Sequence, residues 1–218
     1  MEQLNPTIST IALTMGAAWA SGINLYAAIL VLGLLGATGN AVLPQGLEVL
    51  TNSIVLGAAG FMYIVEFFAD KIPGFDTGWD TVQTFIRIPA GAALAAGAVG
   101  EVNPSIILAA GIVGGGLAAG THATKAGTRV LINSSPEPVS NWMASLTEDF
   151  AVIAGLWTAF HYPWAFVILL ILFIFLMIWL LPKIWRGIKK VLGFIKRIFV
   201  GQTPGDVAED SQAETPQV

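Results

Sequence analysis

Residues 163–182 read Pro-Trp-Ala-Phe-Val-Ile-Leu-Leu-Ile-Leu-Phe-Ile-Phe-Leu-Met-Ile-Trp-Leu-Leu-Pro, without one charged side chain. A helix needs about 20 consecutive apolar residues to cross the hydrocarbon core of a bilayer. The chain as a whole is also apolar: 55% of its 218 residues are hydrophobic and 11% are charged, with a mean hydropathy of +0.74. Soluble domains carry about a quarter charged residues. The sequence therefore predicts an all-α, polytopic membrane protein.

Outward from that segment, hydropathy and turn residues predict six transmembrane helices, at about 7–36, 47–69, 80–100, 104–125, 140–160 and 163–182. The first helix is too long, because its residues would extend about 45 Å against a hydrocarbon core of about 30 Å. It must tilt, protrude or break, and we expect the break at Gly22.

The basic residues orient these helices. If the N-terminus is inside, the outer loops contain no Lys or Arg, and Arg87 lies in the third helix toward the cytoplasmic side. The positive-inside rule then predicts a protein of the cytoplasmic membrane with both termini in the cytoplasm. The basic residues are Lys71, Arg87, Lys125, Arg129, Lys183, Arg186, Lys189, Lys190, Lys196 and Arg197.

Two pairs of similar segments divide the chain into halves, 7–100 and 104–182. Residues 15–24 resemble 113–122, and residues 50–61 resemble 146–157. Three helices in each half would make an inverted repeat, the architecture of many secondary transporters. Chance similarity in a chain with 24 glycines is the alternative. The glycines at 111, 114, 115, 116 and 120 fit close helix–helix approach better than a ligand-binding loop.

The end of the chain is predicted to leave the transmembrane domain, which spans residues 1–182. Residues 183–200 alternate bulky apolar and basic side chains at helical spacing, as in an amphipathic helix that lies at the membrane surface and binds anionic lipids. Residues 201–218 are acidic and lack aromatic residues, and they predict a disordered tail. Before that tail, acidic and basic residues balance, so no basic patch predicts nucleic-acid binding.

Polar and ionisable side chains inside membrane helices are costly unless they are paired or face water, so they are candidates for a functional site. Most gather at the predicted cytoplasmic ends of the second to fifth helices. The candidates are Asn24, Glu66, Asp70, Asp76, Asp80, Arg87, His122, Lys125, Arg129, Asn141, Glu148 and Asp149.

Two interpretations of this set stay open. In the functional one, a cation or proton binds the carboxylates, while the basic groups hold an anion or gate a path. The four carboxylates would be Glu66, Asp70, Asp76 and Asp80, and the basic groups Arg87, His122, Lys125 and Arg129. In the structural one, Arg87 pairs with Asp80 or Glu148, Lys125 pairs with Glu148 or Asp149, and the carboxylates of the loop are solvated. We favour the structural interpretation for Asp76 and Asp80, and a satisfied imidazole over a pH switch for His122.

Arg87 carries the most specific of these predictions. Its guanidinium stays protonated in any protein environment, so it needs a carboxylate partner or water inside the membrane. We predict that Arg87 contacts Glu148 or Asp149 across helices and so joins the two halves. No cofactor is predicted, apart from a divalent cation as a candidate at the four carboxylates, and the absence of Cys with only two His disfavours a zinc enzyme.

Three motifs resemble those of one family. These are Glu66-Phe-Phe-Ala-Asp-Lys-Ile-Pro-Gly-Phe-Asp76 with Asp80 and Thr84-Phe-Ile-Arg87, then His122-Ala-Thr-Lys-Ala-Gly-Thr-Arg129 with 133–141 and 145–149, and Ser21-Gly-Ile-Asn-Leu-Tyr26. They are similar to an uncharacterised bacterial family of integral membrane proteins, described as a domain of unknown function. Many of its members carry Arg at the position of Asn24. The resemblance covers residues 8–182 and implies a compact, multi-span protein of a bacterial inner membrane, without naming a substrate.

Three functions fit this sequence. We favour a small secondary transporter or channel with the charged site described above. The first alternative is a membrane enzyme that binds Mg²⁺ through Asp76 and Asp80 and acts on lipid or polyprenyl headgroups. The second is a non-catalytic scaffold. The bilayer is a partner in each case, and a homo-oligomer stays open.

Overall fold

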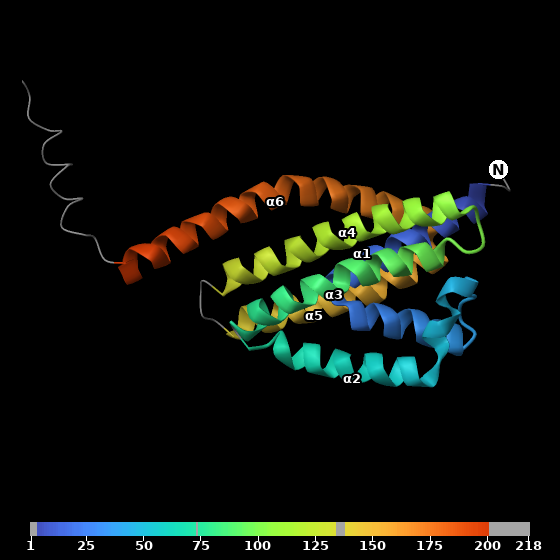
Figure 1. Ribbon diagram of the computed structural model, residues 1–218, viewed down its shortest axis with the longest axis horizontal. Coiled ribbons are helices and arrows are strands. Elements are labelled where there is room, and N and C mark those ends of the chain that lie inside the picture. Colours follow the sequence, from blue (N-terminus) through green and yellow to red (C-terminus); the bar gives the residue numbers. More distant parts are fainter. Residues whose placement is uncertain (1–3, 73, 134–137, 201–218) are drawn as a thin grey trace, which may run out of the picture.

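The computed structural model describes residues 4–72, 74–133 and 138–200, and Figure 1 shows their arrangement. This part of the chain is helical and contains no strand, which confirms the predicted all-α class. The elements are α1 (Leu4–Ala37), the short 3₁₀ helix η1 (Gln45–Thr51), α2 (Ser53–Ala69), α3 (Phe75–Ala98), α4 (Pro104–Ile132), α5 (Pro138–His161) and α6 (Pro163–Val200).

Several helices are suited to a membrane. Within the described part of the chain, Pro6–Ala37, Pro104–Ile132 and Pro163–Gly193 are long and apolar enough to cross one. A fourth crossing would be η1 with α2, two helices bent by 69° at a short break. The helices α3 and α5 are not among them; α3 carries Asp76, Asp80 and Arg87, and α5 carries Glu148 and Asp149. The predicted number of six crossings therefore stays a prediction.

The helix α1 is broken, and its second half turns back toward the end of the bundle where the first half begins. The backbone of Asn24 is non-helical, with φ −146° and ψ 101°. The first half meets the segment that follows the second half, since Ser9 and Leu13 line one pocket together with Val42 and Pro44. The expected break in the long first segment is therefore confirmed, and because α1 turns back there, it is a hairpin whose tip lies inside the bundle and not one straight helix (Figure 1).

The break lies two residues after the predicted position because the side chain of Asn24 supports it. Its Oδ1 accepts a hydrogen bond from the N–H of Ala27 at 3.0 Å, which caps the second half of the hairpin. Gly22 serves close packing instead. A Cβ on Gly22 would lie 2.6 Å from the carbonyl oxygen of Ala118 in α4.

The hairpin lies at the centre of the bundle, where α1 contacts η1 and α2 to α6. Small residues permit this, because Ala17, Ala18 and Ala20 are fully buried. The neighbouring helices α3 and α4 also pack closely, and a Cβ on Gly114 would overlap that of Ala95. The predicted packing role is confirmed for Gly114, Gly115 and Gly120, whereas Gly116 has open space beside it. Since α4 runs without a break where α1 turns back, the two predicted halves differ in their first element.

The helix α6 is longer than predicted and extends past its neighbours (Figure 1). It continues through Pro182 to Val200 in one helix, so the predicted boundary between a membrane helix and a separate surface helix at 182/183 is absent. The predicted disordered tail, 201–218, lies outside the described residues.

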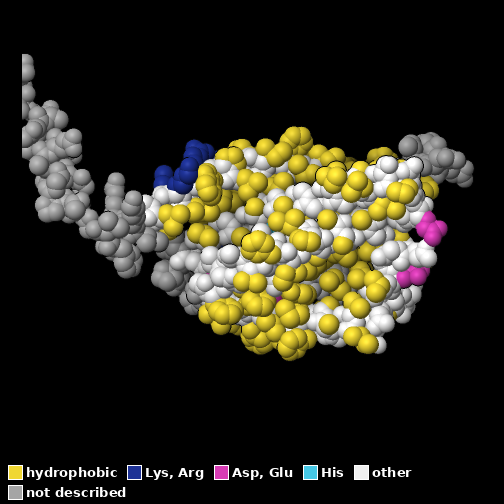
Figure 2. All heavy atoms as spheres, in the orientation of Figure 1, with side chains coloured by type: hydrophobic (Ala, Val, Ile, Leu, Met, Phe, Trp, Pro, Cys, Tyr) yellow, Lys and Arg dark blue, Asp and Glu magenta, His cyan; other side chains and the backbone are white. Residues whose placement is uncertain are grey.

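The two ends of the bundle differ in charge. Figure 2 shows hydrophobic side chains over one face, with Lys and Arg at the end where α6 extends and Asp and Glu at the opposite end. The exposed basic residues of α6 are Lys183, Arg186, Lys189 and Lys190. At the other end Glu48 of η1 and Glu101 before α4 are exposed. The start of α1 lies at this acidic end, opposite the basic end of α6 (Figure 1). That both termini lie in the cytoplasm stays a prediction.

Candidate functional site

A cluster of buried polar side chains surrounds the tip of the α1 hairpin. It unites residues that lie far apart in the sequence, from α1, the end of α2, and the interiors of α3, α4 and α5. All twelve predicted site residues belong to it or border it, and only Glu148 keeps notable access to solvent, with 19% of its side chain exposed. The buried members are Asn24, Glu66, Asp70, Asp76, Asp80, Arg87, His122, Lys125, Arg129, Asn141 and Asp149.

Arg87 of α3 joins the hairpin tip to α2. Its Nη2 pairs with the carboxylate of Glu66, and its Nη1 donates to the carbonyl oxygen of Ile23 at 2.8 Å. The predicted partners Glu148 and Asp149 were wrong, because Arg129 and Asn24 bind these two carboxylates instead. Arg87 is fully buried, so the expectation that it needs a carboxylate partner is confirmed with Glu66 in that role.

Lys125 of α4 lies at the centre of the cluster and is surrounded by carboxylates. Its Nζ lies 2.9 Å from Asp70, 3.3 Å from both Glu66 and Glu148, and 3.8 Å from Asp80. The predicted pair with Glu148 is confirmed. An ammonium group has three N–H donors, so it cannot donate to all four carboxylates at one time.

Arg129, one turn further along α4, closes the cluster toward α5. Its Nε and Nη2 donate to the two carboxylate oxygens of Glu148, at 3.2 and 2.8 Å. Its Nη1 donates to the carbonyl oxygens of Asp70 and Asn141, at 3.0 and 3.1 Å. This bidentate arrangement is the strong form of an Arg–carboxylate pair, and it ties the end of α2 to α4 and α5.

Asp149 of α5 faces the start of the second half of the hairpin. It accepts hydrogen bonds from Nδ2 of Asn24 at 3.1 Å and from the hydroxyl of Tyr63 at 3.0 Å. The N-terminal end of a helix carries a partial positive charge. The carboxylate of Asp149 therefore lies at the end of this half-helix that favours a negative charge.

Asp76 and Asp80 are buried, with 0% and 1% of their surface exposed, so the prediction that they are solvated is wrong. The reason is that α3 begins at Phe75 and both carboxylates enter the bundle with it. Asp76 accepts from the backbone N–H of Gly74 and Thr77, at 2.9 and 2.6 Å, and from Nδ2 of Asn133 at 2.7 Å. Free N–H groups at a helix start suit a carboxylate.

Both ring nitrogens of His122 have hydrogen-bond partners. Arg87 can only donate, so the Nδ1 of His122, 3.2 Å from Nη1 of Arg87, must accept and the Nε2 must carry the proton. That Nε2 lies 3.0 Å from the carbonyl oxygen of Asp80 and 2.8 Å from the hydroxyl of Thr84. A second proton on Nδ1 would point at the guanidinium. The arrangement supports the satisfied, neutral imidazole over the pH switch.

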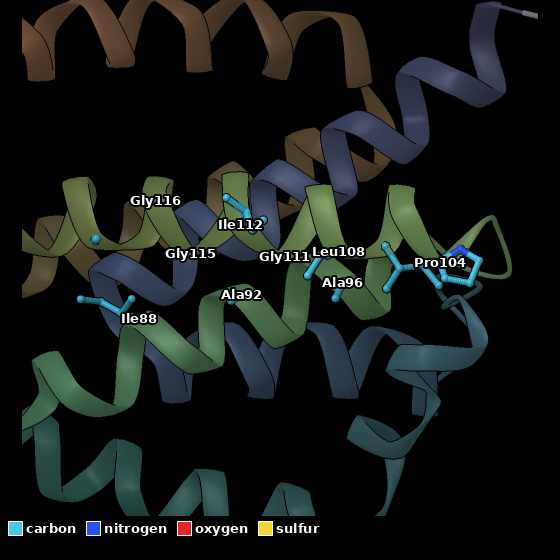
Figure 3. A pocket seen from close by; sticks show the side chains of 11 residues that line it. Ile88, Ala92, Ala96, Pro104, Leu108, Gly111, Ile112, Gly115 and Gly116 are labelled. Carbon is cyan, nitrogen blue, oxygen red and sulfur yellow. The ribbon is translucent and has the colours of Figure 1, made fainter.

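The cluster does not have the geometry of a metal site. Within the described residues, no three carboxylate or imidazole groups converge in a way that could hold a metal ion. The carboxylates instead converge on amine and guanidinium groups. A separate pocket of about 750 Å³ between α3 and α4 is lined by Ile88, Ala92, Leu108, Gly111 and other apolar residues, with no charged side chain (Figure 3).

Three contributing residues were missed as site candidates. Tyr63 precedes Glu66 by three positions and Asn133 follows Arg129 by four, so helical spacing alone could have placed each beside a candidate. The third is Lys71, whose Nζ lies 2.9 Å from the centre of the Phe67 ring and donates to the carbonyl oxygen of Phe67. Burial lowers the pKa of this ammonium group.

Comparison with known proteins supports the resemblance seen in the sequence. The family described as Domain of unknown function (DUF4126) matches residues 11–183, which include the whole cluster. No curated protein and no solved structure matches the chain.

Proposed function

We propose that this chain, which belongs to the DUF4126 family, is a small secondary transporter or channel for a hydrogen ion or another small cation. The observation that carries the proposal is the broken helix α1, whose tip meets the buried charges. In secondary transporters, discontinuous helices place half-helix ends and unwound carbonyl groups at the ion site. Here the carbonyl of Ile23 and the N–H of Ala27 lie on either side of Asn24.

The charge of the cluster favours a cation over an anion. Four carboxylates, Glu66, Asp70, Asp80 and Glu148, contact three basic groups in the ion-pair network. Arg87, Lys125 and Arg129 each already have a carboxylate partner, so none of these three groups is free to bind an anion. The ammonium group of Lys125 lies within 3.8 Å of an oxygen of each of the four carboxylates, so a transported cation would compete with it for these oxygens.

The proposed setting is a bacterial inner membrane, crossed by η1 with α2, by α3, α4, α5 and α6, and entered from one side by the α1 hairpin. The basic end of α6 would lie in the cytoplasm, in keeping with the positive-inside rule, and the start of α1 on the opposite side. Exposed Lys183 and Lys189 lie over the rings of Trp179 and Trp185. Such pairs suit the headgroup region, where these cations would face anionic lipids.

The enzyme alternative has less support. It requires Asp76 to hold Mg²⁺ at the membrane surface, but the oxygens of Asp76 accept hydrogen bonds from Gly74, Thr77 and Asn133. A metal there would have to displace these partners.

The test is ion flux into liposomes that contain the purified full-length protein. A potassium diffusion potential drives the flux, a trapped pH-sensitive dye reports protons, and a sodium-sensitive dye reports sodium. We expect the wild-type protein to move one of these cations faster than protein-free liposomes do, and Glu66→Gln to lower that rate to the protein-free level.

Glu48→Gln is the matched control, because Glu48 is exposed on η1 and far from the cluster. It should leave the rate unchanged, and a thermal melt should show that each variant is folded. If the folded wild-type protein moved neither cation under any imposed gradient, the proposal would be wrong.

A further inference from the structure

The ion-pair network at the hairpin tip contains one acid more than it has bases. Its acids are Glu66, Asp70, Asp80 and Glu148, and its bases are Arg87, Lys125 and Arg129. The other buried acids have neutral partners of their own: Asp76 has Asn133 and backbone N–H groups, and Asp149 has Asn24 and Tyr63. An uncompensated charge is expensive in a dry interior, and a group there binds or releases a proton instead.

The distances identify the acid with the weakest compensation. Glu66 pairs with Arg87, Asp70 lies 2.9 Å from Lys125, and Glu148 binds Arg129 through both oxygens. Asp80 has no comparable partner. Its nearest cationic nitrogens, on Arg87 and Lys125, are both 3.8 Å away. Neither of its carboxylate oxygens accepts a hydrogen bond from any described group, although only 1% of the residue is exposed.

The other groups around Asp80 do not supply the missing charge. The neutral ring of His122 and the hydroxyl of Thr84 both donate hydrogen bonds to the backbone carbonyl of Asp80 and not to its carboxylate. The side of α6 that faces this region is apolar, with Leu181, Ile184, Trp185 and Ile188. The remaining titratable groups near Asp80 are Glu66 and Asp70 at the end of α2, and Lys125 and Arg129 from α4.

A pocket reaches the same residue. A pocket of about 460 Å³ lies between α3, α4 and α6, toward the basic end of the bundle. Asp80 contributes to its lining together with Thr77, Thr81 and Thr84. Thr77, Thr81 and Thr84 lie on the same face of α3 as Asp80, so this wall of the pocket carries hydroxyl groups.

We propose that Asp80 is the proton-binding group of this site and that it exchanges its proton with water through the pocket between α3, α4 and α6. The O–H bond forms when the carboxylate takes a proton from water and breaks when that proton returns, and no electron is transferred. In the protonated state the network is neutral. Loss of the proton leaves one negative charge beside Lys125, which is the state in which a second cation would be attracted. This inference rests on the proposed transport function for its role, but the protonation itself can be tested separately.

Infrared difference spectroscopy tests the protonation directly. Spectra of the full-length protein in lipid are recorded while the buffer pH is stepped, with protein labelled by ¹³C at the Asp carboxyl or at the Glu carboxyl. We expect a titrating C=O band of a protonated carboxyl that shifts with the Asp label and not with the Glu label. This experiment needs no substitution and so does not depend on the folding of a variant.

Substitutions then assign the band to one residue. Asp80→Asn, which mimics the neutral acid, should remove it and leave the protein folded, whereas Asp206→Asn in the acidic tail should leave it unchanged. A band that shifts with the Glu label, persists in Asp80→Asn, or is absent from the wild-type protein would overturn the inference. If the band belongs to Asp80 and the liposomes show no ion flux, the proton site stands and the transport function falls. If the liposomes show ion flux and the band is absent, the transport function stands and the proton site at Asp80 falls.

Discussion

The guanidinium of Arg87 donates a hydrogen bond of 2.8 Å to the carbonyl oxygen of Ile23, the last residue before the break in α1. The carbonyl groups at the end of a helix lack partners within it and carry a partial negative charge. Arg87 meets this end with a permanent positive charge and reaches Glu66 with its other nitrogen. The same residue therefore holds the hairpin tip in the bundle and neutralises a buried acid.

Removal of Arg87 should destabilise the protein strongly. Arg87→Met removes the guanidinium that pairs with buried Glu66 and leaves Lys125, 3.3 Å away, as the cation beside that carboxylate. Breaking a buried pair from one side costs about 3 to 5 kcal/mol. The free energy of unfolding in mixed detergent micelles measures this loss. The double variant Arg87→Met with Glu66→Gln should recover part of it, because no charge is then left alone.

Arg186→Met is the control for this substitution, since Arg186 is exposed on α6 and its Nε donates to the carbonyl oxygen of Pro182 in the same helix. A surface change of this kind should stay within about 0.5 kcal/mol. If Arg87→Met were as stable as Arg186→Met, the pairing described here would not support the fold.

Asn24→Asp should destabilise the hairpin tip through its contact with Asp149. The new carboxylate can still accept from the N–H of Ala27, so the cap is kept, but it lies beside a like charge at about the 3.1 Å of the present hydrogen bond. Like charges this close disfavour each other's ionised form. We expect a lower melting temperature for Asn24→Asp and recovery in the double variant with Asp149→Asn. No recovery in the double variant would contradict the contact.

Gly22→Ala should lower stability by about 1 to 3 kcal/mol, the usual cost of overpacking. The added Cβ would lie 2.6 Å from the carbonyl oxygen of Ala118 and 2.8 Å from Cβ of Thr121, and neither can move without α4. Gly116→Ala is the matched control on α4, where a Cβ meets nothing within 4 Å. Because Ala is the better helix former by about 1 kcal/mol, the control should be neutral or stabilising. Equal losses in the two melts would argue against close contact between α1 and α4.

The hairpin predicts which positions lie on the same side of the membrane. Because the chain contains no Cys, single introduced cysteines can test this. Single cysteines at Pro6, Asn40 and Glu101 should react with a membrane-impermeant maleimide from the same side of the membrane. A cysteine at Lys190 should react from the other side. All four positions are exposed. Labelling of Pro6→Cys from the side of Lys190→Cys would instead fit a crossing helix at 7–36.

The sequence by itself determined the helical class, the approximate bounds of α2 to α5, and the packing role of Gly114, Gly115 and Gly120. These features depend on local properties, namely apolar segment length, turn residues and the absence of a side chain. It also identified nearly all members of the buried cluster, because an ionisable residue in an apolar segment is conspicuous whatever surrounds it.

Only the tertiary structure decided how these residues pair and where α1 turns. Arg87 pairs with Glu66 and not with Glu148, because α2 and the hairpin tip lie against that part of α3. Glu148 pairs with Arg129 instead. The break fell at Asn24 because Asp149, distant in sequence, binds its amide there. Asp76 and Asp80 are buried because α4 packs along α3, and Asn133 at the end of α4 binds Asp76. Each outcome depends on which helices are neighbours in space, and no local pattern of residues encodes that.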